Sequence, residues 1–326
     1  MGAVLALTSV ELCAGAGGQA LGVEQAGFGH EALVELDKHA CETLRLNRPN
    51  WPVFEEDLNS PTEFDAGDYV GIDLLAGGLP CPPFSVAGKQ LGEQDERNLF
   101  DRGVELVDEI RPSAVMFENV KGMLNPSFDD YRGRIGKRLK KLGYTHGWKL
   151  LNASDFGVPQ LRPRVVLVAV RSDRSGNFEW PDARDFLPPK TVGETLHDLM
   201  AIDGWAGADA WRDAANRIAP TVVGGSKKHG GPDLGPTRAK RAWKELDVDG
   251  MGIANEPPAP GFNGIPRLTV QMVARLQGFP DEWEISGRKT NAYRQVGNAF
   301  PPPVAKAVAS KIAAALSSSN QYAVAV

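Results

Sequence analysis

Residues 11–22, "ELCAGAGGQALG", give the clearest indication of the fold. This stretch continues the apolar "AVLALTSV" (3–10) and leads into a segment of helical composition. This order predicts a strand over 3–13, a glycine turn and a helix over 18–27. Gly15 and Gly17, with Ala20 three residues later, fit the turn whose backbone amides face a bound nucleotide at a helix N-terminus.

An acidic residue follows at the place where such a turn needs it. Glu35 ends the next predicted strand, and a carboxylate at that position binds ribose hydroxyls. The turn and the acid therefore favour a cofactor that contains adenosine. They suit a nicotinamide cofactor and S-adenosylmethionine equally well, because both carry the adenosine half.

Strand and helix patterns alternate through the rest of the first half. Further strands are predicted over residues 31–36, 69–77, 113–120 and 164–170. Helices are predicted over residues 38–47, 100–110 and 131–143, and again over 268–278 and 301–317. The alternation predicts an α/β fold with a mostly parallel sheet and helices on both faces. Residues 171–265, rich in Gly, Pro, Asp, Trp and Arg, predict a second, smaller and loop-rich domain.

Composition limits the kind of protein. The 326 residues are 42% hydrophobic and 24% charged, which indicates a globular chain of one large and one smaller domain. The three cysteines are too few and too scattered for a disulfide framework or a zinc site, so we expect no metal and a reducing compartment. No segment is apolar for long enough to span a membrane, and the apolar start lacks the basic region of a signal peptide.

Charge is distributed unevenly. The formal net charge of −5 argues weakly against a nucleic-acid partner. Residues 217–244, however, hold seven cations and a single acid, Asp233, in a Gly- and Pro-rich setting that predicts a docking loop rather than a helix. A second basic run, "RGRIGKRLKK" (132–141), fits a solvated helix face as well as a docking surface.

One thiol lies in an unusual loop, "GGLPCPPFSVAGKQ" (77–90). Cys81 follows a predicted strand, and ligands of open α/β sheets bind beyond the carboxyl ends of strands. Pro80 and Pro82 restrict the backbone around it, and a flexible segment follows. A buried structural cysteine is the ordinary alternative, but the proline setting favours a positioned nucleophile.

Two other motifs supply partners for such a thiol. "MFENV" places Glu118 and Asn119 at the end of another strand, where Glu118 could act as a general acid. "QLRPR" places Gln160, Arg162 and Arg164 at the entry to a strand, with the two arginines on one face and suited to a base carbonyl or a phosphate. A thiol, a carboxylic acid and two guanidinium groups together suit attack on an electron-poor heterocycle.

These motifs, in this order, resemble those of the DNA (cytosine-5) methyltransferases of bacterial restriction-modification systems. The resemblance runs over nearly the whole chain and includes "RLTVQMVARLQGFPDEW" and "RQVGNAFPPPVAKAV" near its end. It implies a Rossmann-like S-adenosylmethionine-dependent methyltransferase domain over 1–171 and 286–326. A smaller target-recognition domain would occupy 172–285.

The resemblance also implies the chemistry. The Cys81 thiolate would add to C6 of a cytosine flipped out of double-stranded DNA, and Glu118 would stabilise charge at N3. Arg164, with Arg162, would hold the base carbonyl, Asn119 would orient the site, and the Pro80 carbonyl would face the exocyclic amine. The methyl group would pass from S-adenosyl-L-methionine to C5 and leave S-adenosyl-L-homocysteine.

Binding residues are implied in the same way. The cofactor would be held by Leu12, Cys13, Ala14, Gly15, Gly17, Glu35, Leu36, Asp57, Leu58, Leu99, Asn298 and Ala299. DNA would be contacted by Ser85, Lys89 and Arg97 in a segment that closes over it, and by Gln160, Lys227, Lys228, Arg238, Lys240 and Arg241. The family usually has Asp-Leu-Phe where this chain has Glu11-Leu12-Cys13, so we expect a re-packed adenine pocket.

Other functions fit less well. A nicotinamide-dependent oxidoreductase would leave the Cys, Glu and Arg set unused, and a thiol hydrolase would need a histidine base that no motif supplies. A tRNA cytosine-5 methyltransferase on the same scaffold is the main alternative, but its Cys-Phe-Thr signature is absent, since no cysteine follows Cys81. A non-catalytic DNA-binding protein would not need a positioned thiol. We expect a monomeric, cytoplasmic, nucleoid-associated bacterial enzyme with no membrane contact and a cognate endonuclease that acts on the same site.

Overall fold

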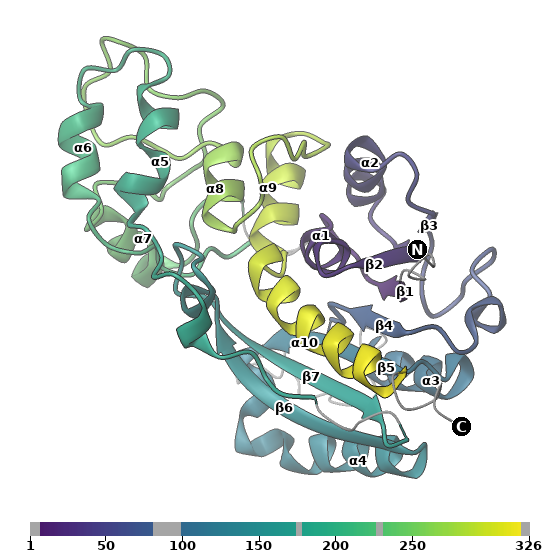
Figure 1. Cartoon of the computed structure of the whole chain (residues 1–326). Helices are drawn as coiled ribbons and strands as arrows, with labels where there is room; N and C mark the ends of the chain where they lie inside the picture. Colours follow the sequence, from purple (N-terminus) through teal and green to yellow (C-terminus); the bar gives the residue numbers. More distant parts are fainter. Residues whose placement is uncertain (1–6, 81–98, 174–177, 226–230, 321–326) are drawn as a thin grey trace, which may run out of the picture.

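The computed structural model describes residues 7–80, 99–173, 178–225 and 231–320. Its seven strands form one sheet in the order β3-β2-β1-β4-β5-β7-β6 (Figure 1). The strands are β1 Leu7–Leu12, β2 Phe28–Glu35, β3 Val53–Glu55, β4 Leu74–Gly77, β5 Ala114–Val120, β6 Tyr144–Asn152 and β7 Pro163–Arg171. The pairings from β3 to β5 are parallel, and β7 is antiparallel to both β5 and β6. The prediction of a mostly parallel sheet is confirmed.

Helices cover both faces of the sheet and continue into a second lobe. Their bounds are α1 Gly18–Gln25, α2 Lys38–Asn47, α3 Leu99–Ile110, α4 Asp129–Lys141, α5 Val192–Ala201, α6 Ala208–Ala214, α7 Thr237–Lys244, α8 Val270–Leu276, α9 Lys289–Asn298 and α10 Pro302–Asn320. Short 3-10 helices lie at Ala66–Tyr69, Lys121–Leu124, Pro126–Phe128, Ala153–Phe156 and Ala183–Asp185.

The strands alternate their side chains between two buried cores. In β7, Val165 and Leu167 pack with α3 and α4, while Val166 and Val168 pack with α10 on the opposite face. Central strands covered on both sides are buried throughout, which explains the continuous apolar run "VVLVAV" in the sequence. The polar side chains of Glu11, Glu118 and Asn119 lie near the carboxyl ends of β1 and β5 and are buried as well.

Two glycines bring α1 against the C-terminal part of the chain. A Cβ at Gly18 would lie 2.3 Å from the Phe300 carbonyl oxygen, and one at Gly22 would lie 2.5 Å from the Pro302 carbonyl oxygen. The two glycines are four residues apart and therefore share one face of the helix. Their spacing lets α10 return onto the first helix of the sheet domain, as Figure 1 shows.

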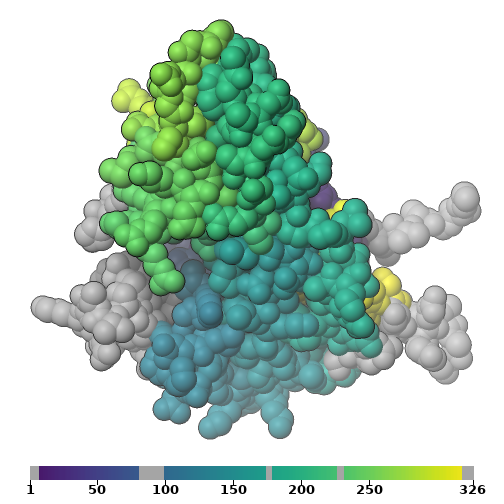
Figure 2. Space-filling model, turned by 90° about the vertical axis from the view of Figure 1, so that its left-hand side faces the viewer, coloured from purple at the N-terminus to yellow at the C-terminus, as the bar shows by residue number. Residues whose placement is uncertain are grey.

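The region after β7 is more regular than its sequence predicts. It contains α5, α6 and α7, and α7 covers a stretch for which we predicted a docking loop. For Thr237–Lys244 the prediction of a loop was wrong, because the apolar positions of these helices face a core of their own, in which Trp211 and Trp243 are buried. The same core includes Ala16 and Leu21 from the α1 region, so the second lobe packs directly on the start of the sheet domain. Figure 2 shows this lobe above the part of the surface formed by residues 100–170.

Two negative findings concern the described residues only. No helix among them is both long and apolar enough to cross a membrane. No group of three or more His, Cys, Asp or Glu side chains among them is arranged to hold a metal ion.

Candidate active site

A cavity of about 380 Å³ opens beyond the carboxyl ends of β1, β2 and β4. Its size falls within the usual range for small-molecule sites. The lining residues come from the glycine turn, from the loops after β2, β3 and β4, and from the end of α9. Among the predicted site residues, those that line it are Cys13, Ala14, Gly15, Glu35, Leu36, Asp57, Leu58, Pro80, Leu99, Glu118, Asn298 and Ala299.

The glycine turn is tied to the acid at the end of β2. Gly15 has φ +54° and donates its N–H to Glu35 Oε2 at 2.7 Å, while the Asp37 N–H donates to Oε1 at 2.7 Å. Burial raises the pKa of Glu35, and these two amides oppose that rise. The carboxylate is thus fixed at the cavity wall by the backbone on both sides.

Two buried polar side chains, Glu11 and Gln19, line the cavity beside the glycine turn. Glu11 and Gln19 are 1% and 4% exposed, and both line the cavity. Neither carboxylate oxygen and neither amide atom has a hydrogen-bond partner among the described residues. Burial raises the pKa of Glu11 well above its usual range. Unpaired buried groups are costly, so a polar ligand that pairs with them gains binding energy.

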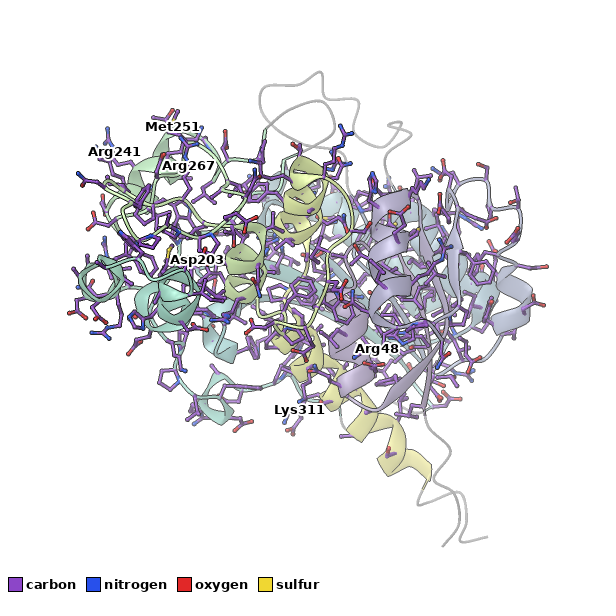
Figure 3. The ribbon with its side chains drawn as sticks, turned by 90° about the horizontal axis from the view of Figure 1, so that it is seen from above. Arg48, Asp203, Arg241, Met251, Arg267 and Lys311 are labelled. Atoms are coloured by element: carbon purple, nitrogen blue, oxygen red, sulfur yellow. The ribbon has the colours of Figure 1, made fainter. Side chains whose placement is uncertain are left out.

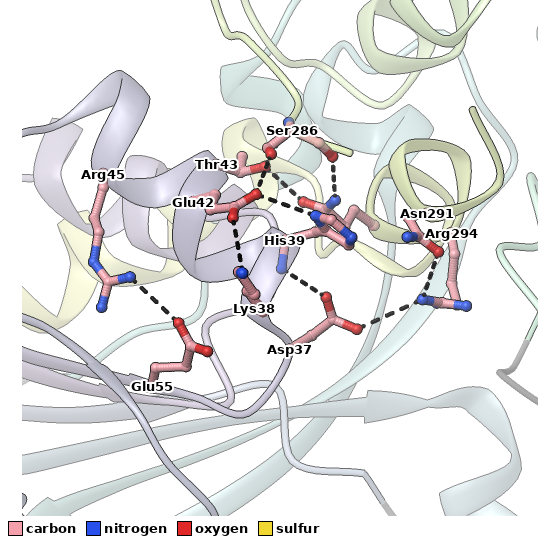
Figure 4. A network of polar contacts seen from close by, with 11 residues as sticks. Asp37, Lys38, His39, Glu42, Thr43, Arg45, Glu55, Ser286, Asn291 and Arg294 are labelled. Atoms are coloured by element: carbon pink, nitrogen blue, oxygen red, sulfur yellow. Dashed lines mark hydrogen bonds and ion pairs between the residues drawn. The ribbon is translucent and has the colours of Figure 1, made fainter. Parts of the chain in front are cut away.

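The mouth of the cavity is apolar on one side and held by a polar network on the other. Leu36 is 61% exposed there, and Leu58 is buried beside it, so that the two offer surfaces for a flat ring. Figure 4 shows the network that joins α2 to the segment before and within α9. Thr43 Oγ donates to Gln295 Oε1 at 2.7 Å, and Arg294 pairs with Asp37 at 3.5 Å.

One edge of the cavity holds a buried ion pair. Arg164 Nε lies 2.7 Å from Glu118 Oε1, and their side chains are 12% and 11% exposed. Asn119 donates its amide to the Leu79 carbonyl at 3.0 Å and so fixes the loop after β4 against β5. The Pro80 carbonyl accepts the Leu99 N–H at 3.2 Å.

The protonation of Glu118 depends on two opposing influences. Burial raises its pKa, and the guanidinium groups of Arg164 and Arg162 lower it only in part. The net direction is upward, so the protonated acid is stabilised relative to a free glutamate. With Oε1 held by Arg164, the other oxygen is the one available to give a proton to a ligand.

The structure corrects two predictions from the "QLRPR" motif. Gln160 is fully buried: it donates to the Gln277 side chain at 2.8 Å and accepts the Val222 N–H at 2.9 Å, so it does not face DNA. Arg162 is also fully buried and donates to the carbonyls of Val222, Gly297 and Ala299 at 2.8–2.9 Å. Of the two arginines, only Arg164 forms an ion pair with Glu118, which lines the cavity.

Two cofactor predictions are corrected by packing. Leu12 is 0% exposed and lies in the core beneath the turn rather than in the cavity wall. A Cβ at Gly17 would lie 2.7 Å from Leu44 and 2.9 Å from Trp283, so this glycine serves side-chain packing instead of cofactor approach. Gly18, its neighbour, lines the cavity.

Cys13 lines the cavity, as predicted, with φ +54°, which is rare for a residue other than glycine. Burial raises the pKa of its thiol and so disfavours the reactive thiolate. Several other predicted residues lie outside the described part of the chain: Cys81, Ser85, Lys89, Arg97, Lys227 and Lys228.

The remaining basic residues predicted to meet DNA lie on α7. Arg238 and Arg241 are exposed and, three residues apart, share one face of the helix. Lys240 is paired with Asp233 at 2.9 Å and is partly buried, so it is less available to a phosphate.

Sequence reasoning missed several cavity residues. Glu11 at the end of β1 and Gln19 at the start of α1 flank the glycine turn, and the sequence gave no signal that their side chains would be buried in the cavity wall. Arg294, Gln295 and Phe300 lie in the quoted "RQVGNAF" motif, of which only Asn298 and Ala299 were singled out.

Comparisons with known proteins agree with this geometry. Residues 7–314 match the family described as C-5 cytosine-specific DNA methylase. The chain is similar to the type II methyltransferase M.NaeI of Lentzea aerocolonigenes, at 58% identity over 95% of this chain and 75% of that protein. It is 52% identical to the type II methyltransferase M.NgoMIV of Neisseria gonorrhoeae, over 96% of this chain and 99% of that one.

A solved structure gives the same fold at lower identity. A prophage-encoded protein of E. coli superposes with a TM-score of 0.68 at 24% identity, over 95% of this chain and 99% of that chain. The cavity beyond the strand ends, the buried acid–arginine pair and the match over nearly the whole length lead to one conclusion: the chain belongs to the C-5 cytosine-specific DNA methylases.

Proposed function

We propose that this enzyme transfers a methyl group from S-adenosylmethionine to C5 of a cytosine flipped out of a short, specific double-stranded DNA sequence. The observation that carries this proposal is the buried Glu118–Arg164 pair at the edge of the cavity. Asn119, next to Glu118, holds the carbonyl of Leu79 in the loop after β4, and Cys81 comes two residues after Leu79 in the sequence. A proton donor fixed by an arginine suits a reaction that must place a proton on a ring nitrogen.

The cavity fits the cofactor that the family implies. Leu36 and Leu58 would cover the adenine, and Glu35 would accept from the ribose. Glu11, which is unpaired and buried, would meet the ammonium group of the methionine part. When bound, S-adenosylmethionine supplies an electrophilic methyl group on its sulfonium sulfur.

The protein's own groups would then activate the cytosine. The Cys81 thiolate forms a bond to C6 while Glu118 gives its proton to N3, which makes C5 electron-rich enough to take the methyl group. Arg164 keeps Glu118 in place and balances its charge when the proton has left. A base then removes the C5 proton, N3 returns its proton to Glu118, and Cys81 departs.

Access to the base would come from the second lobe. Flipping a cytosine costs a few kcal/mol of stacking and pairing, which contacts to the DNA backbone must offset. Arg238 and Arg241 on α7 are exposed cations suited to phosphates. We assign the recognition role to residues 172–285, and we expect the enzyme to act as a monomer alongside an endonuclease with the same target.

Two assays test the proposal: the formation of 5-methylcytosine and the trapping of a covalent complex between the enzyme and DNA. Incubation of unmethylated duplex DNA with the enzyme and radiolabelled cofactor should give 5-methylcytosine and, with 5-fluorocytosine at the target position, a covalent complex stable to denaturation. Cys81→Ser should give neither while it still binds the DNA. A covalent complex with the serine variant would contradict the role of Cys81.

A further inference from the structure

A turn in the second lobe presents an arginine that no step of the proposed reaction uses. The turn runs from Asp249 to Gly252, next to α7, and Arg267 lies beside it. Arg267 Nε donates to Asp249 Oδ2 at 2.7 Å. The other carboxylate oxygen, Oδ1, accepts the Met251 N–H at 2.9 Å, so one aspartate holds both the turn and the arginine.

This arrangement fixes one edge of the guanidinium and leaves the other exposed. The Arg267 side chain is 48% exposed, and neither terminal nitrogen has a hydrogen-bond partner among the described residues. A Cβ at Gly252 would lie 3.2 Å from Arg267 Nη1, so the glycine leaves room for the fork. Burial alone would raise the pKa of Asp249, but the hydrogen bonds from Arg267 and Met251 outweigh it and keep the carboxylate ionised.

The turn also exposes an apolar side chain beside these charges. Met251 is 66% exposed, more than most large apolar residues of the chain. Figure 3 shows Arg241, Met251 and Arg267 together at one corner of the second lobe, away from Arg48 and Lys311. Exposure of the Met251 side chain to water is unfavourable. Together with the neighbouring arginines it matches the edges of DNA bases, which offer hydrogen-bond acceptors and methyl groups.

A short series of contacts joins this corner to the cavity. The Gly250 carbonyl accepts the Leu234 N–H at 3.0 Å, next to the start of α7. Residues 234–235 lie against Val223, whose carbonyl accepts the Tyr293 hydroxyl of α9 at 3.0 Å. The C-terminal end of α9 lines the cavity, so these contacts connect the turn and α7 to the cavity wall.

We propose that Arg267, held by Asp249, reads a guanine of the recognition sequence in the major groove. The terminal nitrogens of the guanidinium match the O6 and N7 acceptors of guanine, and fixing Nε in advance reduces the entropy lost on binding. Asp249 is a positioning residue, and Met251 packs against the neighbouring base. The exposed arginines of α7 contact phosphates instead, so they contribute affinity without sequence information.

An ordinary surface ion pair is the competing explanation, and the chain provides its own control. Arg184 is 89% exposed and pairs with Asp182 through both carboxylate oxygens. Although Arg184 falls within residues 172–285, it lies in the 3-10 helix Ala183–Asp185. The next residue, Phe186, packs on Phe156 of the sheet domain, so this segment is not part of the corner formed by the turn and α7. Arg184→Ala therefore removes an arginine–aspartate pair of the same kind without touching the proposed reading surface.

The test maps methylation at base resolution on unmethylated genomic DNA for the wild type, Arg267→Ala, Arg267→Lys, Asp249→Asn and Arg184→Ala. Because the inference rests on the proposed function, the wild type must first methylate one defined sequence; if it methylates none, the proposed function fails and not merely the reading role. Given that result, Arg267→Ala should lose discrimination by about tenfold to a hundredfold at one G·C pair and keep it elsewhere.

The other variants sharpen the outcome. Arg267→Lys keeps the charge but not the fork, so it should relax the same base pair, and Asp249→Asn should relax it to a smaller extent. Arg184→Ala should methylate the wild-type sequence with wild-type selectivity. Each variant is first shown to unfold in urea like the wild type. Unchanged selectivity in both Arg267 variants would then overturn the proposal. Loss of selectivity spread evenly over all positions of the sequence would overturn it too.

Discussion

Replacement of Arg162 by lysine tests whether this residue joins the two lobes or touches the substrate. The guanidinium donates to three buried carbonyls, at 2.8 Å to Val222 and Gly297 and at 2.9 Å to Ala299. A lysine ammonium is a single point and cannot span all three, so one or two carbonyls lose their donor. Each carbonyl left without a donor costs about 1–3 kcal/mol of stability. Arg162 Nε is buried without a hydrogen-bond partner among the described residues, so its removal offsets part of this cost. We expect the free energy of unfolding to fall by about 2–4 kcal/mol.

Urea unfolding followed by tryptophan fluorescence measures this change, because Trp211 and Trp243 are buried in the core of the second lobe. A loss of this size is a large fraction of the roughly 5–15 kcal/mol of a typical domain. The KM for S-adenosylmethionine should rise as well, since Ala299 lines the cavity. If Arg162→Lys unfolds like the wild type while kcat falls sharply, Arg162 contacts the reacting base and the structural assignment is refuted.

Three further predictions address the acid, the cavity and the DNA surface. Glu118→Gln should lower kcat by about 10²–10⁴-fold with little change in cofactor affinity measured by calorimetry; an equal loss of affinity would place Glu118 in the cofactor site. Burial raises the pKa of Glu11 in the folded protein, whereas in the unfolded chain it titrates at about 4.3. Between these two pKa values the folded state holds a proton that the unfolded state has lost. The free energy of unfolding should therefore fall as the pH rises from about 4.3 through the folded pKa. Glu11→Gln should make this fall shallower in urea midpoints recorded from pH 4.5 to 8, while Glu35 and Glu118, whose pKa values are also raised, keep their share of it. Parallel pH profiles of the variant and the wild type would contradict the prediction. A plot of the logarithm of the DNA-binding constant against the logarithm of the salt concentration should have a slope of about −0.9 for each phosphate neutralised. The double variant Arg238→Ala, Arg241→Ala should have a shallower slope. An unaltered slope would mean that α7 does not face the DNA.

The sheet domain was predictable because its signals are local. The run of Val165–Val170 is apolar without alternation, as a central strand covered on both faces requires, and the Gly15 turn has a fixed spacing. The strands β3 and β6 were missed. β3 is only three residues long, and β6 is an edge strand with mixed, half-buried positions, so neither has a clear period.

The second lobe was not predictable from the same signals. Its helices are short, and their apolar residues meet partners distant in sequence, as Trp211 and Trp243 do. Arg162 and Gln160 illustrate the same limit for the site, because a polar residue in a motif suggests a ligand contact. Both instead bind the backbone of Val222, about 60 residues away: Arg162 donates to its carbonyl and Gln160 accepts its N–H. Tertiary partners of this kind leave no trace in a local pattern.

The central claim is methyl transfer to cytosine C5 through Cys81 at one sequence, and a base-resolution map of 5-methylcytosine tests it most directly. Unmethylated genomic DNA is treated with S-adenosylmethionine and either the wild type or Cys81→Ser. The wild type should methylate a single short sequence completely, and the variant should methylate none. Methylation by Cys81→Ser, or none by a folded wild-type protein that binds its cofactor, would contradict that claim.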